Sequence, residues 1–161
     1  FTDRRQRQMC IRDRYIADKS GQKIWQMLKG ASHGWDEPRT PVKYYVQNTV
    51  VIKRGKNNDF LKVHRRFKQV MSKMEYTGNR GVFKLVSGGN EQTFMVIRGF
   101  DSHSETFTTN LPEDGSWRDV YAELFGDEAL AEDMPALNES IEMWGSSVVK
   151  MMYRPDLSSK L

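Results

Sequence analysis

One polar residue interrupts an otherwise apolar pattern in segment 42–54, and its position could serve chemistry. Asn48 alternates with the apolar and aromatic residues Val42, Tyr44, Val46, Val50 and Ile52. A buried amide needs hydrogen-bond partners, so Asn48 is either satisfied locally or faces a ligand cavity. Tyr44 shares its face and could line the same cavity, although alternating tyrosines in a strand also serve ordinary packing.

Arg98 is a second candidate, because it shares an alternating face with Phe94, Val96 and Phe100. A guanidinium among aromatic rings can bind an acidic or phenolate ligand. It can equally pair with a carboxylate at a contact between subunits. The sequence leaves both interpretations open.

His64 lies one step from the apolar stripe of segment 58–74, among Phe60, Phe67 and Met71. An imidazole there could act as a base, an acid or a metal ligand, or could be a histidine at the edge of the core. His33 and His103 fall in expected loops. The histidines and Cys10 lack the spacing of a zinc site, so we predict no metal and no cofactor.

The order of the elements follows from periodicity and turn residues. Apolar alternation predicts strands over 42–54, 81–87, 92–100 and 147–154, and Gly88-Gly89-Asn90 predicts a hairpin between the second and third. Spacings of three and four predict helices over 18–30, over 58–74, and from Ser116 to Gly145 with a restart at Pro135. Residues 101–115 are expected to form a long loop. The acidic residues Asp127, Glu128, Glu132 and Asp133 predict a solvated helix face.

This order predicts an α+β, ferredoxin-like β-α-β-β-α-β domain over residues 42–161. Right-handed crossovers would place both helices of the domain on one face of an antiparallel sheet. The opposite face would stay partly apolar and would need a cover. No run of about 18 apolar residues predicts a membrane helix.

The N-terminal region is expected to differ in origin from the domain. Residues 4–14, inside the segment 1–14, resemble translated sequencing-adapter read-through of the kind found in environmental gene assemblies, which indicates a non-native segment. Residues 15–41 predict a helix and connector, as an accessory element or the remnant of an upstream domain. We therefore expect the native N-terminus to be missing, which leaves cytoplasmic and periplasmic locations equally open.

Charge is distributed unevenly along the chain. The net charge of +4 falls to about +1 without residues 1–14, which hold five arginines and two aspartates. Residues 15–75 then carry 13 basic and 5 acidic residues, whereas residues 76–161 carry 7 and 14. The two halves could be separately solvated faces or could complement each other, within or between chains.

A family resemblance is carried by Lys53-Arg54-Gly55-Lys56, by Asp59-Phe60 at a helix start, and by 97–102. These segments resemble the dimeric α+β barrel superfamily, which includes antibiotic-biosynthesis-monooxygenase-like and NIPSNAP-like domains. The resemblance implies a homodimer with two sheets packed face to face and a pocket between sheet and helices. Some oxygenases of this family hold substrate or dioxygen with a strand asparagine, a role that would fall to Asn48.

Three functions follow as expectations. The first is a small-molecule-binding barrel, which could act as a cofactor-independent monooxygenase-like enzyme. Its ligand would be contacted by Asn48, His64, Arg98 and Tyr44. The second is a non-enzymatic dimerisation or scaffold domain that pairs with a tandem upstream domain. The third is an RNA-binding module, because 80–86 partly matches an RNA-recognition motif. The motif's aromatic pattern is incomplete, so no nucleic acid is expected as a partner.

Overall fold

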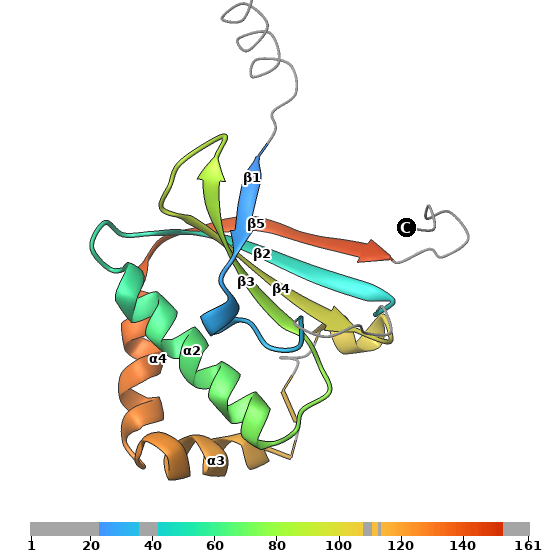
Figure 1. The fold of residues 1–161 in the computed structure, drawn as a ribbon, viewed down its shortest axis with the longest axis vertical. Helices are drawn as coiled ribbons and strands as arrows, with labels where there is room; N and C mark the ends of the chain where they lie inside the picture. Colours follow the sequence, from blue (N-terminus) through green and yellow to red (C-terminus); the bar gives the residue numbers. More distant parts are fainter. Residues whose placement is uncertain (1–22, 36–41, 108–110, 113, 153–161) are drawn as a thin grey trace, which may run out of the picture.

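A computed structural model describes residues 23–35, 42–107, 111–112 and 114–152, with backbone alone at 107 and from 146 to 152. Its architecture is α+β, with an open antiparallel sheet and three helices, and it is consistent with a ferredoxin-like fold (Figure 1). The strands are β1 (Ile24–Met27), β2 (Tyr44–Ile52), β3 (Arg80–Ser87), β4 (Thr93–Phe100) and β5 (Ile141–Met152). They lie in the order β1-β3-β4-β2-β5.

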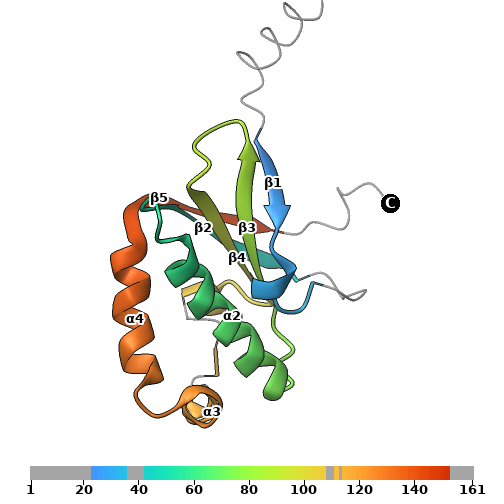
Figure 2. The same cartoon turned by 60° about the vertical axis from the view of Figure 1, so that its left-hand side comes forward.

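The helices are α2 (Asn57–Lys73), α3 (Ser116–Phe125) and α4 (Ala129–Ser140), with short 3-10 turns over Lys29–Ala31 and Ser104–Phe107. All three lie on one side of the sheet, as Figures 1 and 2 show from two directions. The predicted placement of the helices is therefore confirmed at this level. Within the described residues, no helix has the length and apolar character needed to cross a membrane.

The core lies between this helical layer and the sheet. The apolar stripe predicted for α2 is confirmed, because Phe60, Val63, Phe67, Val70 and Met71 are all buried. They face apolar side chains on the inner side of the sheet, which include Val50, Ile52, Val82, Phe94 and Val96. Burial of this apolar surface is the main force that holds α2 on the sheet.

The helix predicted over 18–30 is wrong where the structure describes it. Residues 24–27 form the edge strand β1, which pairs antiparallel with β3 and places Trp25 beside Leu85 and Met27 beside Phe83. Trp25 and Met27 are two residues apart, so the segment also satisfies the alternation of a strand. The edge of β3 supplies backbone hydrogen-bond partners, and this tertiary pairing selects the strand over the helix. Residues 18–22 lie outside the described residues.

The predicted end of the last helix is also wrong. The chain leaves α4 at Ser140, and β5 begins at Ile141 instead of residue 147. Trp144 pairs with Val50, and Gly145 pairs with Thr49, beside an irregularity in the register. A Cβ at residue 145 would lie 2.6 Å from the Thr49 carbonyl oxygen, so only glycine fits this approach. Pro135 lies inside α4, where the sequence predicted the start of a helical segment.

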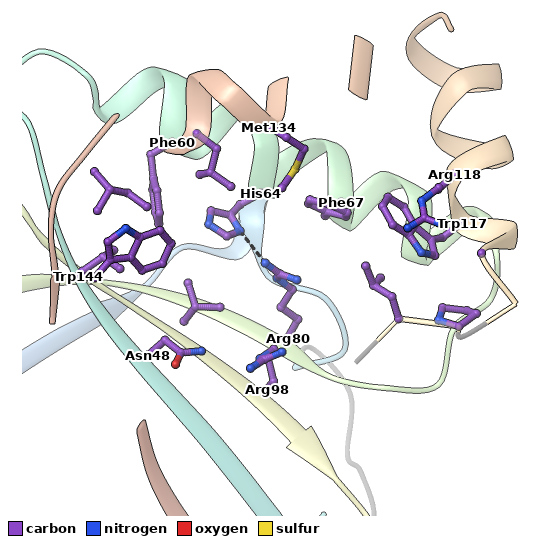
Figure 3. A pocket seen from close by; sticks show the side chains of 17 residues that line it. Asn48, Phe60, His64, Phe67, Arg80, Arg98, Trp117, Arg118, Met134 and Trp144 are labelled. Carbon is purple, nitrogen blue, oxygen red and sulfur yellow. Dashed lines mark hydrogen bonds between the residues drawn. The ribbon is translucent and has the colours of Figure 1, made fainter. Parts of the chain in front are cut away.

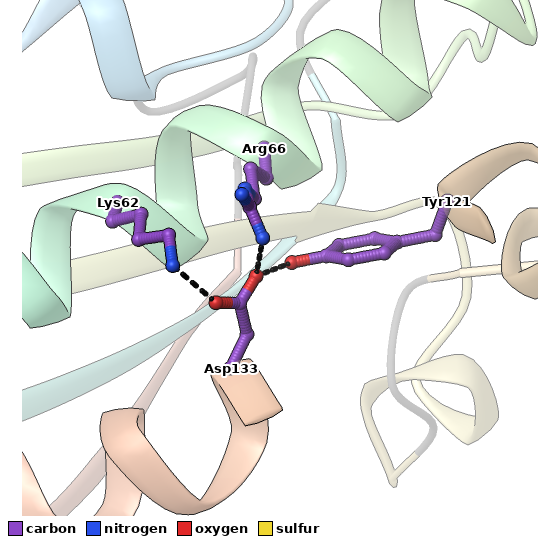
Figure 4. A network of polar contacts seen from close by, with 4 residues as sticks. All are labelled: Lys62, Arg66, Tyr121 and Asp133. Carbon is purple, nitrogen blue, oxygen red and sulfur yellow. Dashed lines mark hydrogen bonds and ion pairs between the residues drawn. The ribbon is translucent and has the colours of Figure 1, made fainter. Parts of the chain in front are cut away.

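A buried network joins the three helices (Figure 4). Asp133 on α4 is 1% exposed, which corrects the expectation that it lies on a solvated face. Its carboxylate pairs with Lys62 at 2.9 Å and with Arg66, and it accepts a hydrogen bond from the Tyr121 hydroxyl. These partners come from α2 and α3, so basic α2 and the acidic C-terminal half complement each other within the chain.

Candidate functional site

A cavity of about 530 Å³ lies between the inner face of the sheet and the helices (Figure 3). The four strands β2 to β5, all three helices and the loop before α3 contribute to its wall. Most of this wall is apolar or aromatic. A small set of polar side chains converges on its centre, which is the usual composition of a small-molecule site.

Three of the four predicted site residues line this cavity, namely Asn48, His64 and Arg98. They come from β2, α2 and β4, so only the tertiary structure brings them together. Tyr44 is not among the lining residues. Its ring packs against His103, with the ring centroids 5.8 Å apart, near the short turn that follows β4.

Arg80 is a lining residue that the site prediction missed. The register of the β3–β4 hairpin pairs Arg80 directly with Arg98, so both side chains leave the same face of the sheet. The two arginines are equally distant in sequence from Gly89 in the predicted turn. Counting outward from that turn could have found the pair.

Arg80 has few polar contacts for a cation inside a protein. Its guanidinium lies 3.3 Å from His64 Nδ1 and 5.1 Å from the centre of the Phe67 ring. Its Nε is buried and has no hydrogen-bond partner among the described residues. Burial, with a smaller effect from the charge of Arg98, lowers the pKa of Arg80 to about 10. The side chain therefore stays charged near neutral pH.

His64 is buried against Phe60, with the ring centroids 4.4 Å apart. Burial and the nearby charge of Arg80 hold its pKa well below the ordinary value of 6.5, so the ring is neutral. An arginine only donates hydrogen bonds, so Nδ1 must accept from Arg80 and Nε2 must carry the proton. His64 thus presents a donor at Nε2, whereas the sequence left base, acid and metal ligand open.

Arg98 and Asn48 complete the polar centre. The Arg98 guanidinium lies 5.7 Å from the centre of the Phe100 ring, and burial lowers its pKa. Asn48 carries the only oxygen atom among the side chains known to line the cavity. No carboxylate belongs to this set, whereas three arginines do, with Arg118 as the third.

The two ends of the cavity differ. Figure 3 shows Phe60 and Trp144 at one end, Trp117 and Arg118 at the other, and the polar centre between them. The Arg118 guanidinium lies 5.0 Å from the Trp117 ring. Trp144 is 63% exposed, which is unusual for so large an apolar side chain.

This arrangement can bind and orient a ligand with several hydrogen-bond donors. The lining side chains of the described chain include no nucleophilic hydroxyl, thiol or carboxylate. Within the same part of the chain, no group of three or more histidine, cysteine or acidic side chains is placed to hold a metal ion. The donors favour an acceptor-rich, negatively charged ligand.

Comparisons with known proteins matched the chain to no protein family, no curated protein and no solved structure. The resemblance to dimeric α+β barrels, and the oxygenase role that it implies for Asn48, therefore stay predictions.

Proposed function

We propose that the protein binds a small organic anion in the cavity between its sheet and its helices. The observation that carries this proposal is Arg80, a cation in a mostly apolar wall whose buried Nε has no hydrogen-bond partner among the described residues. Buried charges in proteins are normally paired or bound to a ligand of opposite sign. A ligand carboxylate or phosphate would supply acceptor oxygens, of which the lining side chains of the described chain offer only that of Asn48.

The surroundings of Arg80 support an anion over a neutral or cationic ligand. Arg98 adds a second guanidinium on the neighbouring strand, and His64 directs its Nδ1 lone pair to Arg80. Donors of this kind recognise carboxylate and phosphate oxygens, often in a bidentate arrangement. The apolar walls would contact the remainder of the molecule.

The test is a ligand comparison in which only charge changes. We would measure thermal shifts and calorimetric binding for 2-naphthoate, 2-naphthamide and 2-naphthylmethylamine. A ligand that binds only the folded state raises the melting temperature by mass action. We expect stabilisation by the carboxylate and little by the amide or the amine.

A matched pair of variants assigns the effect to the cavity. Arg80→Met should weaken binding of the carboxylate by about 100-fold, the order expected when a charged hydrogen-bonding partner is lost. Arg65→Met removes an equal charge from an exposed site on α2 and should leave affinity unchanged. Equal affinity in both variants, or equal binding of acid and amide, would show that the cavity is not an anion site.

We also propose that the helix-free face of the sheet pairs with a second copy of the chain, as the resemblance implies. The strand register places Met27, Phe83, Met95, Ile97 and Met143 on this face. Apolar surface of one sheet can be covered by the same surface of another, which gives a two-fold symmetric contact. Met143 is 58% exposed in the single chain and would lie in such a contact.

Light scattering across a dilution series tests the pairing. We expect a dimer mass at low micromolar concentration and a shift towards monomer in Met143→Lys. Val86→Lys is the control, because Val86 is 51% exposed but lies on the opposite face of the sheet. A monomer mass throughout the series would refute the pairing and would leave the anion site unaffected.

A further inference from the structure

The cavity has a direction, because its charged residues occupy the centre and one end. Figure 3 places Phe60 and Trp144 at the end away from Arg118. The apolar residues Val50, Leu137 and Ile141 also line the cavity. Val50 pairs with Trp144 in the sheet and therefore belongs near the Trp144 end.

We infer that the bound anion is an aryl carboxylate whose carboxylate meets Arg80 and Arg98 and whose ring lies against Phe60 and Trp144. This inference rests on the proposed function and specifies the ligand and its orientation. Two guanidinium groups on neighbouring strands, with the His64 Nε2 donor nearby, suit a planar carboxylate. Two aromatic side chains at the uncharged end suit a flat apolar body.

The exposure of Trp144 is the second argument for this orientation. Trp144 is 63% exposed although it also lines the cavity. A ring bound beside it would remove apolar surface from water on both partners, which is favourable. The opposite end offers less, because there the Trp117 ring already contacts the Arg118 guanidinium.

Tryptophan fluorescence can locate the ring of the ligand. The protein has four tryptophans, and Trp117 and Trp144 are the two that line the cavity. We would titrate 2-naphthoate, benzoate and cyclohexanecarboxylate into the wild type, Trp117→Phe and Trp144→Phe. The emission change should persist in Trp117→Phe and disappear in Trp144→Phe.

Affinity supplies an independent measurement. Calorimetry should show tighter binding in the order 2-naphthoate, benzoate, cyclohexanecarboxylate. Trp144→Ala should weaken 2-naphthoate by about tenfold, the scale of one lost aromatic contact. Trp117→Ala should change this affinity less than twofold. Melting temperatures of the unliganded variants would confirm that each one folds.

The outcomes separate this inference from the proposed function. If 2-naphthoate binds through Arg80 but the signal and affinity depend on Trp117, the orientation is wrong and the anion site stands. If alkyl and aryl acids bind equally and Trp144→Ala has no effect, the aryl class is wrong. If no acid binds and Arg80→Met changes nothing, the proposed function itself fails.

Discussion

Two charged side chains inside the molecule, Asp133 and Arg80, differ in how well their charges are paired. Asp133 is 1% exposed and has three partners, Lys62, Arg66 and Tyr121 (Figure 4). Arg80 has a buried Nε with no hydrogen-bond partner in the described part of the chain, and its polar neighbours in the wall are the neutral ring of His64 and a second cation, Arg98 (Figure 3). The Asp133 network holds the helices together, whereas Arg80 retains hydrogen-bonding capacity for a ligand.

The pKa values show the same contrast. Burial would raise the pKa of Asp133, but hydrogen bonds from Tyr121, Lys62 and Arg66 outweigh it and leave the pKa below its ordinary value. At Arg80, burial and the nearby charge of Arg98 both lower the pKa, and no acidic group among the described residues raises it again. The first environment therefore favours its ion, and the second disfavours it.

The largest effect should follow removal of the satisfied charge. Asp133→Ala leaves two cations and a buried hydroxyl without their acceptor, so we expect the free energy of unfolding to fall by about 3 kcal/mol. Urea unfolding would measure the change. Glu132→Ala, at an exposed neighbouring position, is the control. A loss similar to that of the control would mean that the network contributes little.

Removal of the unsatisfied charge, Arg80, should change the free energy of unfolding in the opposite direction. Without ligand, Arg80→Met should raise the free energy of unfolding by about 1–2 kcal/mol, because an apolar side chain replaces a poorly compensated ion. Arg65→Met should stay within about 0.5 kcal/mol of the wild type. Destabilisation by Arg80→Met in urea unfolding would erase the contrast between the two charges.

A pH titration sharpens the comparison through His64. Its folded pKa is lowered, so the unfolded chain binds the proton first as pH falls below about 6.5. The stability is fully present above that pH and declines towards pH 5, with a slope approaching about 1.4 kcal/mol per pH unit. His64→Gln should remove this component, whereas His103→Gln, at an exposed position, should retain it. Equal slopes in the wild type and His64→Gln would contradict the assignment.

The smallest effect tests one bond of the Asp133 network. Tyr121→Phe removes the hydroxyl that donates to the carboxylate but leaves Lys62 and Arg66 in place. We expect a loss of about 1 kcal/mol in the free energy of unfolding, the usual contribution of one hydrogen bond. The double variant Tyr121→Phe/Asp133→Ala should lose less than the two single losses combined. Fully additive losses would show that the two residues act separately.

Local pattern determined much of this architecture. The strand around Asn48, the helix around His64 and the hairpin centred on Gly89 were all predictable, because their periodicity and turn residues agree with the final packing. The same patterns identified Asn48, His64 and Arg98 as candidates, because the periodicity of the sequence alone shows a polar residue on or beside an apolar face.

Tertiary contacts decided the rest. Residues 24–27 and 141–146 satisfy helical as well as extended patterns, and the free edges of β3 and β2 select the strand. In the sequence, Asp133 cannot be distinguished from the neighbouring solvated acidic residues. It is buried because α2 and α3 supply its ion-pair and hydrogen-bond partners. Nothing in its local sequence distinguishes Arg80 from an exposed strand arginine. Its position beside Arg98 and in contact with His64 follows from the hairpin register and from the packing of α2. Such properties depend on which elements become neighbours, and that is settled only when the whole core forms.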